Sequence, residues 1–145
     1  MTAADAPGRL ESVDPREVKF TQAWCSPWFR NGDGTIPDLF MNIVSGRVLV
    51  RDVPPLCVYW YQGRRFSVDN RRLVVWRALR MQGVIRRVPV FQMREDVALP
   101  PSFFWKFRTP CMGEFILVED VYLLVGTHCM CFVPPNSLHA TYAAS

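Results

Sequence analysis

The pattern of apolar and polar positions predicts a β-hairpin that leads directly into a helix in the middle of the chain. Residues 56–61 carry apolar or aromatic side chains on both faces of a predicted strand, which is typical of a strand covered on both sides or of one that presents a wide aromatic surface. The pair Gln62-Gly63 predicts a two-residue hairpin turn, because glycine readily adopts a positive φ angle. Residues 64–68 predict the returning strand. In residues 69–82 apolar side chains recur at helical spacing, so the hairpin is expected to pass straight into a helix.

Residues typical of helix ends support this helix and a second one. Asp69 is a favourable N-cap for the central helix, and Gly83 favours its end. Thr35 and Asp38 predict a capping box at the start of another helix, which Gly46 can end. Further strands are predicted over residues 17–22, 86–93, 114–118 and 121–133.

Together these elements predict one α/β (α+β) domain with a small mixed sheet. The strand over residues 86–93 is expected beside the hairpin, because a strand–helix–strand unit favours a right-handed crossover within one sheet. The composition divides the chain into a flexible tail over residues 1–16, a core over residues 17–96, a β-rich extension over residues 97–139 packed on the same domain, and a tail over residues 140–145.

Charge and cysteine content indicate a protein inside the cell with a mild preference for anionic partners. The chain of 145 residues has 17 basic and 13 acidic side chains, a net charge of +4. Its five cysteines cannot all pair within one chain, which favours reduced thiols. Residues 1–16 lack the apolar segment of a signal peptide, and no run of about 18 apolar residues occurs. We therefore expect an intracellular protein, cytoplasmic or nuclear rather than secreted, without a membrane partner.

Two arginines in the first turn of the central helix predict an anion site. Arg71 and Arg72 face the positive end of the helix dipole, where a positive charge costs about 0.3–1 kcal/mol unless an anion offsets it. Unpaired N–H groups and two guanidinium groups form a suitable seat for a phosphate. Arg64 and Arg65 point to opposite faces of the returning strand, and we expect Arg64 to reach the same anion. The alternative is a solvated helix start whose arginines pair with acids from elsewhere in the chain.

The residues around this helix start resemble the ParB and sulfiredoxin superfamily. The sequence Asp-Asn-Arg-Arg-Leu at residues 69–73, with Trp-Arg-Ala at residues 76–78, is similar to the box of a group of ParB-like domains. Those domains also begin with a Phe-Thr-Gln strand, as residues 20–22 do, and carry Pro-Pro ahead of the hairpin, as residues 54–55 do. The similarity spans roughly residues 17–93.

The resemblance implies a compact α/β domain with a phosphate-gripping turn between a strand and a helix. In such a domain Asn70, Arg71 and Arg72 would contact the phosphate of a nucleotide or nucleic acid, and ATP or another nucleotide, with Mg²⁺, is the candidate cofactor. The nucleophilic cysteine of sulfiredoxins is absent from this box, and Asn70 replaces the glutamate of the ParB box. The resemblance therefore implies binding rather than the chemistry of either relative.

Two other functions remain open at this point. One is an enzyme, either a nuclease or a nucleotide phosphohydrolase or phosphotransferase, with Asp69 as the weak candidate for a catalytic group. The other is a catalytically inactive scaffold that binds a protein partner through exposed aromatic side chains. The same side chains can instead stack on bases. The aromatic residues concerned are Trp24, Trp28, Phe29, Tyr59, Trp60, Tyr61 and residues 103–105.

A metal site is the last possibility that the sequence raises. Cys129 and Cys131 project from one face of a predicted strand, with His128 on the other face. Two thiols do not make a zinc site, and a further ligand would have to come from Cys111, Cys25 or His139. A Cys–His nucleophile pair is equally open, but no third group that would orient it can be identified. Because free cysteines in apolar strands are commonly core residues, we predict no metal site.

Overall fold

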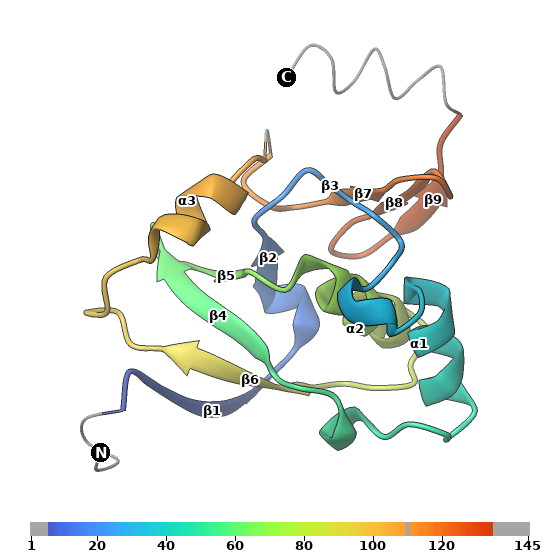
Figure 1. Ribbon diagram of the computed structural model, residues 1–145, viewed down its shortest axis with the longest axis horizontal. Helices are drawn as coiled ribbons and strands as arrows, with labels where there is room; N and C mark the ends of the chain where they lie inside the picture. Colours follow the sequence, from blue (N-terminus) through green and yellow to red (C-terminus); the bar gives the residue numbers. More distant parts are fainter. Residues whose placement is uncertain (1–5, 110, 135–145) are drawn as a thin grey trace.

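The computed structural model describes residues 6–109 and 111–134, and this part of the chain is a mixed α/β structure with two mixed sheets and three α-helices (Figure 1). The larger sheet has the order β1-β6-β4-β5-β2 and contains β1 (Gly8–Val13), β2 (Val18–Phe20), β4 (Leu56–Tyr61), β5 (Arg64–Ser67) and β6 (Val88–Met93). The smaller sheet has the order β3-β7-β8-β9 and contains β3 (Trp24–Cys25), β7 (Ile116–Val118), β8 (Leu123–Val125) and β9 (Met130–Phe132). The helices are α1 (Ile36–Val44), α2 (Asn70–Met81) and α3 (Pro101–Lys106), with short 3₁₀ helices η2 (Pro15–Glu17), η3 (Arg30–Gly32) and η4 (Val50–Asp52). The predicted α/β class with a mixed sheet is confirmed at this level.

The hairpin of β4 and β5 leads into α2, as the sequence predicts. Gln62 and Gly63 both have positive φ angles, 51° and 74°, as a tight two-residue hairpin turn requires. After two connecting residues, α2 begins at Asn70 and runs to Met81. Gly83 follows the end of this helix with a φ of 74°. The predicted turn, returning strand and central helix are therefore confirmed.

Strands from distant parts of the chain complete the larger sheet. β6 lies parallel to β4, as predicted for the strand that follows the helix, and β2 lies parallel to β5. β1 pairs antiparallel with β6, from Gly8 opposite Met93 to Val13 opposite Val88. Residues 8–13 are thus an edge strand, and the prediction of a tail over residues 1–16 is wrong for them. Pairing with a strand about eighty residues away, rather than local composition, decides their conformation.

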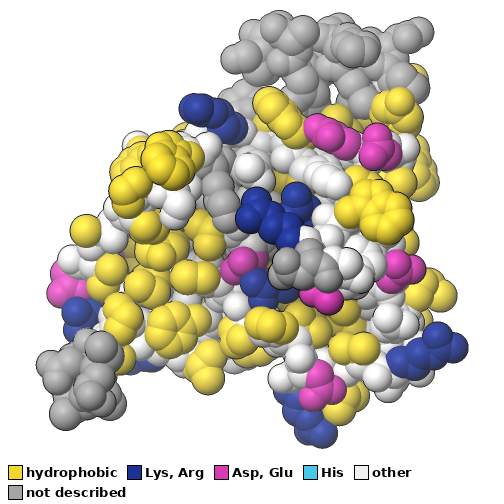
Figure 2. Space-filling view, in the orientation of Figure 1, with side chains coloured by type: hydrophobic (Ala, Val, Ile, Leu, Met, Phe, Trp, Pro, Cys, Tyr) yellow, Lys and Arg dark blue, Asp and Glu magenta, His cyan; other side chains and the backbone are white. Residues whose placement is uncertain are grey.

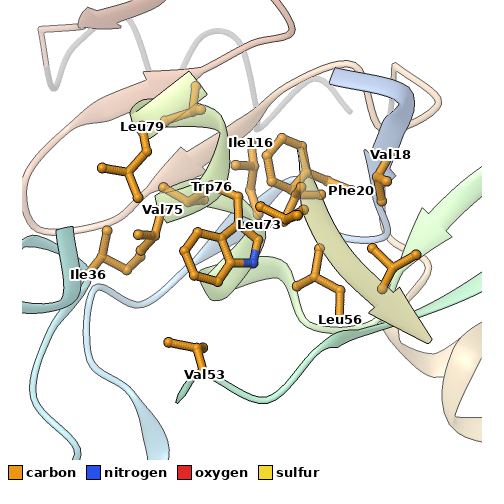
Figure 3. Packing of buried hydrophobic residues seen from close by; sticks show 14 of the residues in the cluster. Val18, Phe20, Ile36, Val53, Leu56, Leu73, Val75, Trp76, Leu79 and Ile116 are labelled. Carbon is orange, nitrogen blue, oxygen red and sulfur yellow. The ribbon is translucent and has the colours of Figure 1, made fainter. Parts of the chain in front are cut away.

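The main core lies between the larger sheet and α2, with α1 packed beside α2. Thr35 and Asp38 form the predicted capping box at the start of α1, in which each backbone N–H donates to the other residue's side chain. Figure 3 shows Trp76 of α2 among buried side chains that come from β2, β4 and α1. Among the described helices, none is long and apolar enough to cross a membrane.

The predicted C-terminal extension contains α3 and most of the smaller sheet. The aromatic segment at residues 103–105 lies in α3, where fully buried Phe103 packs against Tyr59 and Tyr61 of β4, with ring centroids 5.8 and 5.5 Å away. β3, from the N-terminal part of the chain, pairs with β7, so core and extension share one sheet. The predicted tail at residues 140–145 lies outside the described residues.

A buried arginine joins α2 to both sheets. Arg77 is 0% exposed, and its guanidinium carbon lies 4.5 Å from the centre of the Phe20 ring. It donates hydrogen bonds to the backbone oxygens of Val18 and Glu114 and to the hydroxyl of Thr127. Burial lowers its pKa to about 10, because a charged group is disfavoured away from water. These contacts fix α2 against β2 and against the smaller sheet.

Candidate functional site

Asp69 occupies the N-cap position of α2, but its side chain does not cap the helix. Its backbone angles are −105° and 65°, and it makes no side-chain capping bond. One carboxylate oxygen accepts a hydrogen bond from the backbone N–H of Cys57 at 2.7 Å, and the other forms a 2.7 Å ion pair with Arg72. The prediction of Asp69 as N-cap is therefore right for its position and wrong for its side chain. The N–H groups of the first turn keep no side-chain cap.

Asn70, the first residue of α2, ties the helix to the end of β2. Its side chain is buried at 4% exposure, and its amide oxygen accepts the backbone N–H of Thr21 at 2.9 Å. Its amide nitrogen donates to the hydroxyl of Thr21 at 2.9 Å and to Gln22 at 3.2 Å. Thr21 in turn donates its hydroxyl to the Ser67 carbonyl. The amide of Asn70, predicted as a phosphate contact, is thus engaged by the protein itself.

The two predicted arginines differ in how many hydrogen-bond and ion-pair partners their guanidinium groups already have. Arg72 donates to the carbonyls of Pro54 and Pro55, in addition to its ion pair with the N-cap carboxylate. Arg71 donates only its Nε to the Ser26 carbonyl, at 3.2 Å. Among the described residues no carboxylate forms an ion pair with Arg71, so its two terminal nitrogens remain available. Arg72 therefore pairs with an acid, but with the N-cap residue of its own helix rather than with an acid from elsewhere in the chain, and no described acid pairs with Arg71.

These side chains line an open pocket of about 720 Å³ at the start of α2. Its basic residues are Arg30, Arg71 and Arg72, and its acidic residues are Asp33, Asp52 and Asp69. Apolar residues form the remaining wall, namely Phe29 before η3, Leu39 of α1, Val48, Val53 and Pro54 of the segment before β4, and Val68 after β5. Figure 2 shows Lys and Arg side chains gathered near the centre of the visible face, with acidic side chains beside them. The pocket thus combines a charged side with an apolar side.

The structure does not bring Arg64 to this pocket. Arg64 begins β5, next to the hairpin turn, whereas α2 follows the other end of that strand. It lines a separate hollow together with Lys19, Glu17 and Glu114. Its neighbour Arg65 lies over the Trp60 ring, 4.7 Å from the centroid. The expectation that Arg64 reaches the anion at α2 fails because the length of the strand separates them.

The cysteines do not form a site with the other predicted ligands. In the described part of the chain no three His, Cys, Asp or Glu side chains come close enough to hold a metal ion, and His139 lies outside it. Cys129 and Cys131 are exposed, Cys131 within β9, while Cys25 is buried. Burial raises the pKa of Cys25 to about 12, although the charge of Arg71 opposes this shift. None of the five cysteines forms a disulfide.

Sequence reasoning missed several residues of the pocket. Arg30 and Asp33 reach it from the η3 turn, and Asp52 and Val53 reach it from the segment that ends at η4. The one signal for Arg30 in the sequence is that a basic residue stands directly before an Asn-Gly-Asp-Gly turn. Of the predicted aromatic residues, Phe29 is the one that lines the pocket.

Compared with protein-family models, with curated proteins and with solved structures, the chain gave no significant match in any of the three comparisons. The resemblance to ParB-like domains therefore rests on the residues of the box and of the hairpin.

Proposed function

We propose that the protein is a ParB/sulfiredoxin-like domain that binds a phosphate-bearing ligand, a nucleotide or a nucleic acid, in the pocket at the start of α2. The observation that carries the proposal is Arg71, whose terminal nitrogens form no ion pair with a carboxylate of the described part of the chain. An intracellular setting belongs to the proposal, because reduced thiols are the rule inside cells and none of the five cysteines forms a disulfide.

Three features of the helix start favour an anion at this place. The first N–H groups of α2 lack a side-chain cap, and they lie at the positive end of the helix dipole. Arg71 adds a guanidinium group, which can bind two phosphate oxygens at once. Arg30, which is exposed at the rim, adds a second positive charge. An anion placed here would receive hydrogen bonds from the backbone and from both side chains.

The rest of the pocket favours an organic phosphate over inorganic phosphate. A volume of about 720 Å³ lies within the range of pockets for small organic ligands and far exceeds the size of one phosphate ion. Phe29, Leu39 and Val48 form an apolar wall against which a base or another flat group can pack. A ligand with one charged end and one apolar end, as a nucleotide or one unit of a nucleic acid has, therefore fits both sides.

Titration calorimetry with inorganic phosphate, ATP, CTP and a short single-stranded DNA tests this proposal. We expect at least one organic phosphate to bind more tightly than inorganic phosphate, and Arg71→Gln to weaken its binding about tenfold or more. Arg64→Gln is the matched control, since it removes the same charge from the same chain at a separate hollow. Binding that is absent from the wild-type protein, or that falls equally in both variants, would contradict the proposal.

Asp69 favours binding over turnover. One of its carboxylate oxygens accepts a hydrogen bond from Cys57 and the other is paired with Arg72, so neither is available to act as a general base. The enzyme alternative predicts that ATP or DNA is consumed when Mg²⁺ is added. Product analysis of the same mixtures therefore decides between the two functions.

A further inference from the structure

β1 is an edge strand of the larger sheet. It lies at one end of the strand order of the larger sheet, and no described strand pairs with it opposite β6 (Figure 1). Arg9 and Leu10 in its middle are 82% and 66% exposed. An exposed edge of this kind is a template on which another strand can add.

The hydrogen-bonding pattern shows which backbone groups of β1 point outward. The N–H of Arg94 donates to the carbonyl of Pro7 at 2.9 Å, so the residues two, four and six positions after Pro7 also face β6. The N–H and C=O groups of Gly8, Leu10 and Ser12 therefore point away from the sheet. The carbonyl of Ser12 accepts a hydrogen bond from the exposed side chain of Arg87, and a carbonyl oxygen has a second lone pair for another donor.

The side chains of β1 are complementary to β1 itself. If two copies pair antiparallel about an axis at Leu10, Arg9 of each strand faces Glu11 of the other, and the two Leu10 residues face each other. The outward groups of Gly8 then meet those of Ser12 in the partner strand. A pairing centred on Arg9 or on Glu11 would instead oppose two like charges. The charges therefore favour the register centred on Leu10 over those centred on Arg9 or Glu11.

Both faces of the strand are suited to this register. Arg9 and Glu11 lie on one face, where Glu11 is 3.8 Å from Arg65. Leu10 lies on the other face, beside Phe91 of β6. Figure 2 shows that hydrophobic side chains cover much of the visible face over β4, β6 and β1. Pairing two copies would cover the exposed Leu10 side chains and join these two apolar faces.

We propose that β1 pairs antiparallel with β1 of a second copy of this chain, centred on Leu10, to form a homodimer with one continuous ten-stranded sheet. The contact lies at the opposite edge of the sheet from β5 and β2, whose ends position the pocket, so it is independent of ligand binding.

Sedimentation velocity over a wide range of protein concentration tests the dimer. We expect Arg9→Glu and Glu11→Arg each to raise the dissociation constant of the dimer about tenfold, because each places like charges opposite one another twice. The double variant exchanges the two charges and should restore the dimer. An equimolar mixture of the two single variants should form a heterodimer, since each then supplies the charge that the other needs.

Leu10→Pro provides a test through the backbone. The N–H of Leu10 points outward, so proline at this position leaves the bonds to β6 intact and blocks the new strand pair. Urea unfolding of every variant checks that the fold persists. A wild-type protein that stays monomeric at the highest concentration overturns the proposal. So does a dimer that neither Leu10→Pro nor the charge variants weaken, or a mixture of single variants that stays monomeric.

Discussion

Replacing Asn70 with alanine should destabilise the protein, because the side chain of Asn70 holds the end of β2 to the start of α2. The buried N–H of Thr21 donates to the amide oxygen of Asn70, and the loss of this acceptor costs about 1–3 kcal/mol. The two hydrogen bonds donated by the amide nitrogen add about 0.5–1.5 kcal/mol each. Since such contributions are not fully additive, we expect the free energy of unfolding to fall by about 2–4 kcal/mol.

Arg71→Ala, at the next position, should behave in the opposite way. It loses one hydrogen bond to Ser26 but also removes a positive charge from the positive end of α2. The free energy of unfolding should then change by less than about 1 kcal/mol. The stabilisation that a bound organic phosphate gives, about 2.7 kcal/mol at a hundredfold excess over its dissociation constant, should disappear.

Urea unfolding followed by tryptophan fluorescence, with and without the ligand, measures both quantities. Gln82→Ala is the control, because Gln82 is exposed beyond the end of α2 and its loss should cost under about 0.5 kcal/mol. If Asn70→Ala unfolds at the same urea concentration as the wild-type protein, the network around Thr21 does not hold the helix start. If Arg71→Ala keeps the full ligand effect, the phosphate does not sit at Arg71.

Three further predictions concern other parts of the fold. Burial raises the pKa of Asp14, but hydrogen bonds from Arg16 outweigh it and lower the pKa from 3.8 to about 2. The resulting stability is present above pH 3.8 and is lost as the pH falls through about 2. Because the Asp14–Arg16 pair is partly exposed, solvent screening reduces its contribution, and Asp14→Asn should cost on the order of 1 kcal/mol at neutral pH. The variant should also lose less stability below pH 4, as measured by urea unfolding across pH. Gly113 has a φ of 77°, and a Cβ at this position would meet the carbonyl of Phe20. Gly113→Ala should therefore lower the free energy of unfolding by more than about 2 kcal/mol, which a lower Tm would show. At pH 8 a thiol reagent should modify Cys129 quickly and Cys25 only after unfolding, since burial raises the pKa of Cys25 to about 12. Peptide mass mapping measures both rates, and rapid labelling of Cys25 in the native protein would contradict the prediction.

Elements whose conformation is set by nearby residues were predictable from the sequence. The turn at Gln62-Gly63 depends on a glycine at the right place, and the capping box of α1 depends on two residues three positions apart. The apolar repeat of α2 and its termination before Gly83 are local in the same sense. These signals also located Arg71 and Arg72 at the helix start.

Features that depend on distant partners were not predictable in this way. The strand β1 has no strong pattern of its own and becomes a strand by pairing with β6. Asn70 was predicted to contact phosphate because Thr21, its true partner, lies 49 positions earlier in the chain. Arg30 enters the pocket only because the η3 turn folds over the start of α2. Each of these outcomes requires the three-dimensional fold and cannot be read from spacing.

The buried guanidinium of Arg77 determines how short a functional fragment of this protein can be. Arg77 donates to three acceptors, on Val18, Glu114 and Thr127. Ending the chain after residue 108 would remove Glu114 and Thr127 and leave only the acceptor on Val18. A buried charge that has lost its partners is strongly destabilising. The shortened chain would keep every pocket residue, but α2 would no longer be held in position. The smallest fragment that keeps the pocket must therefore extend beyond Thr127, and truncations intended to isolate the pocket should preserve the smaller sheet.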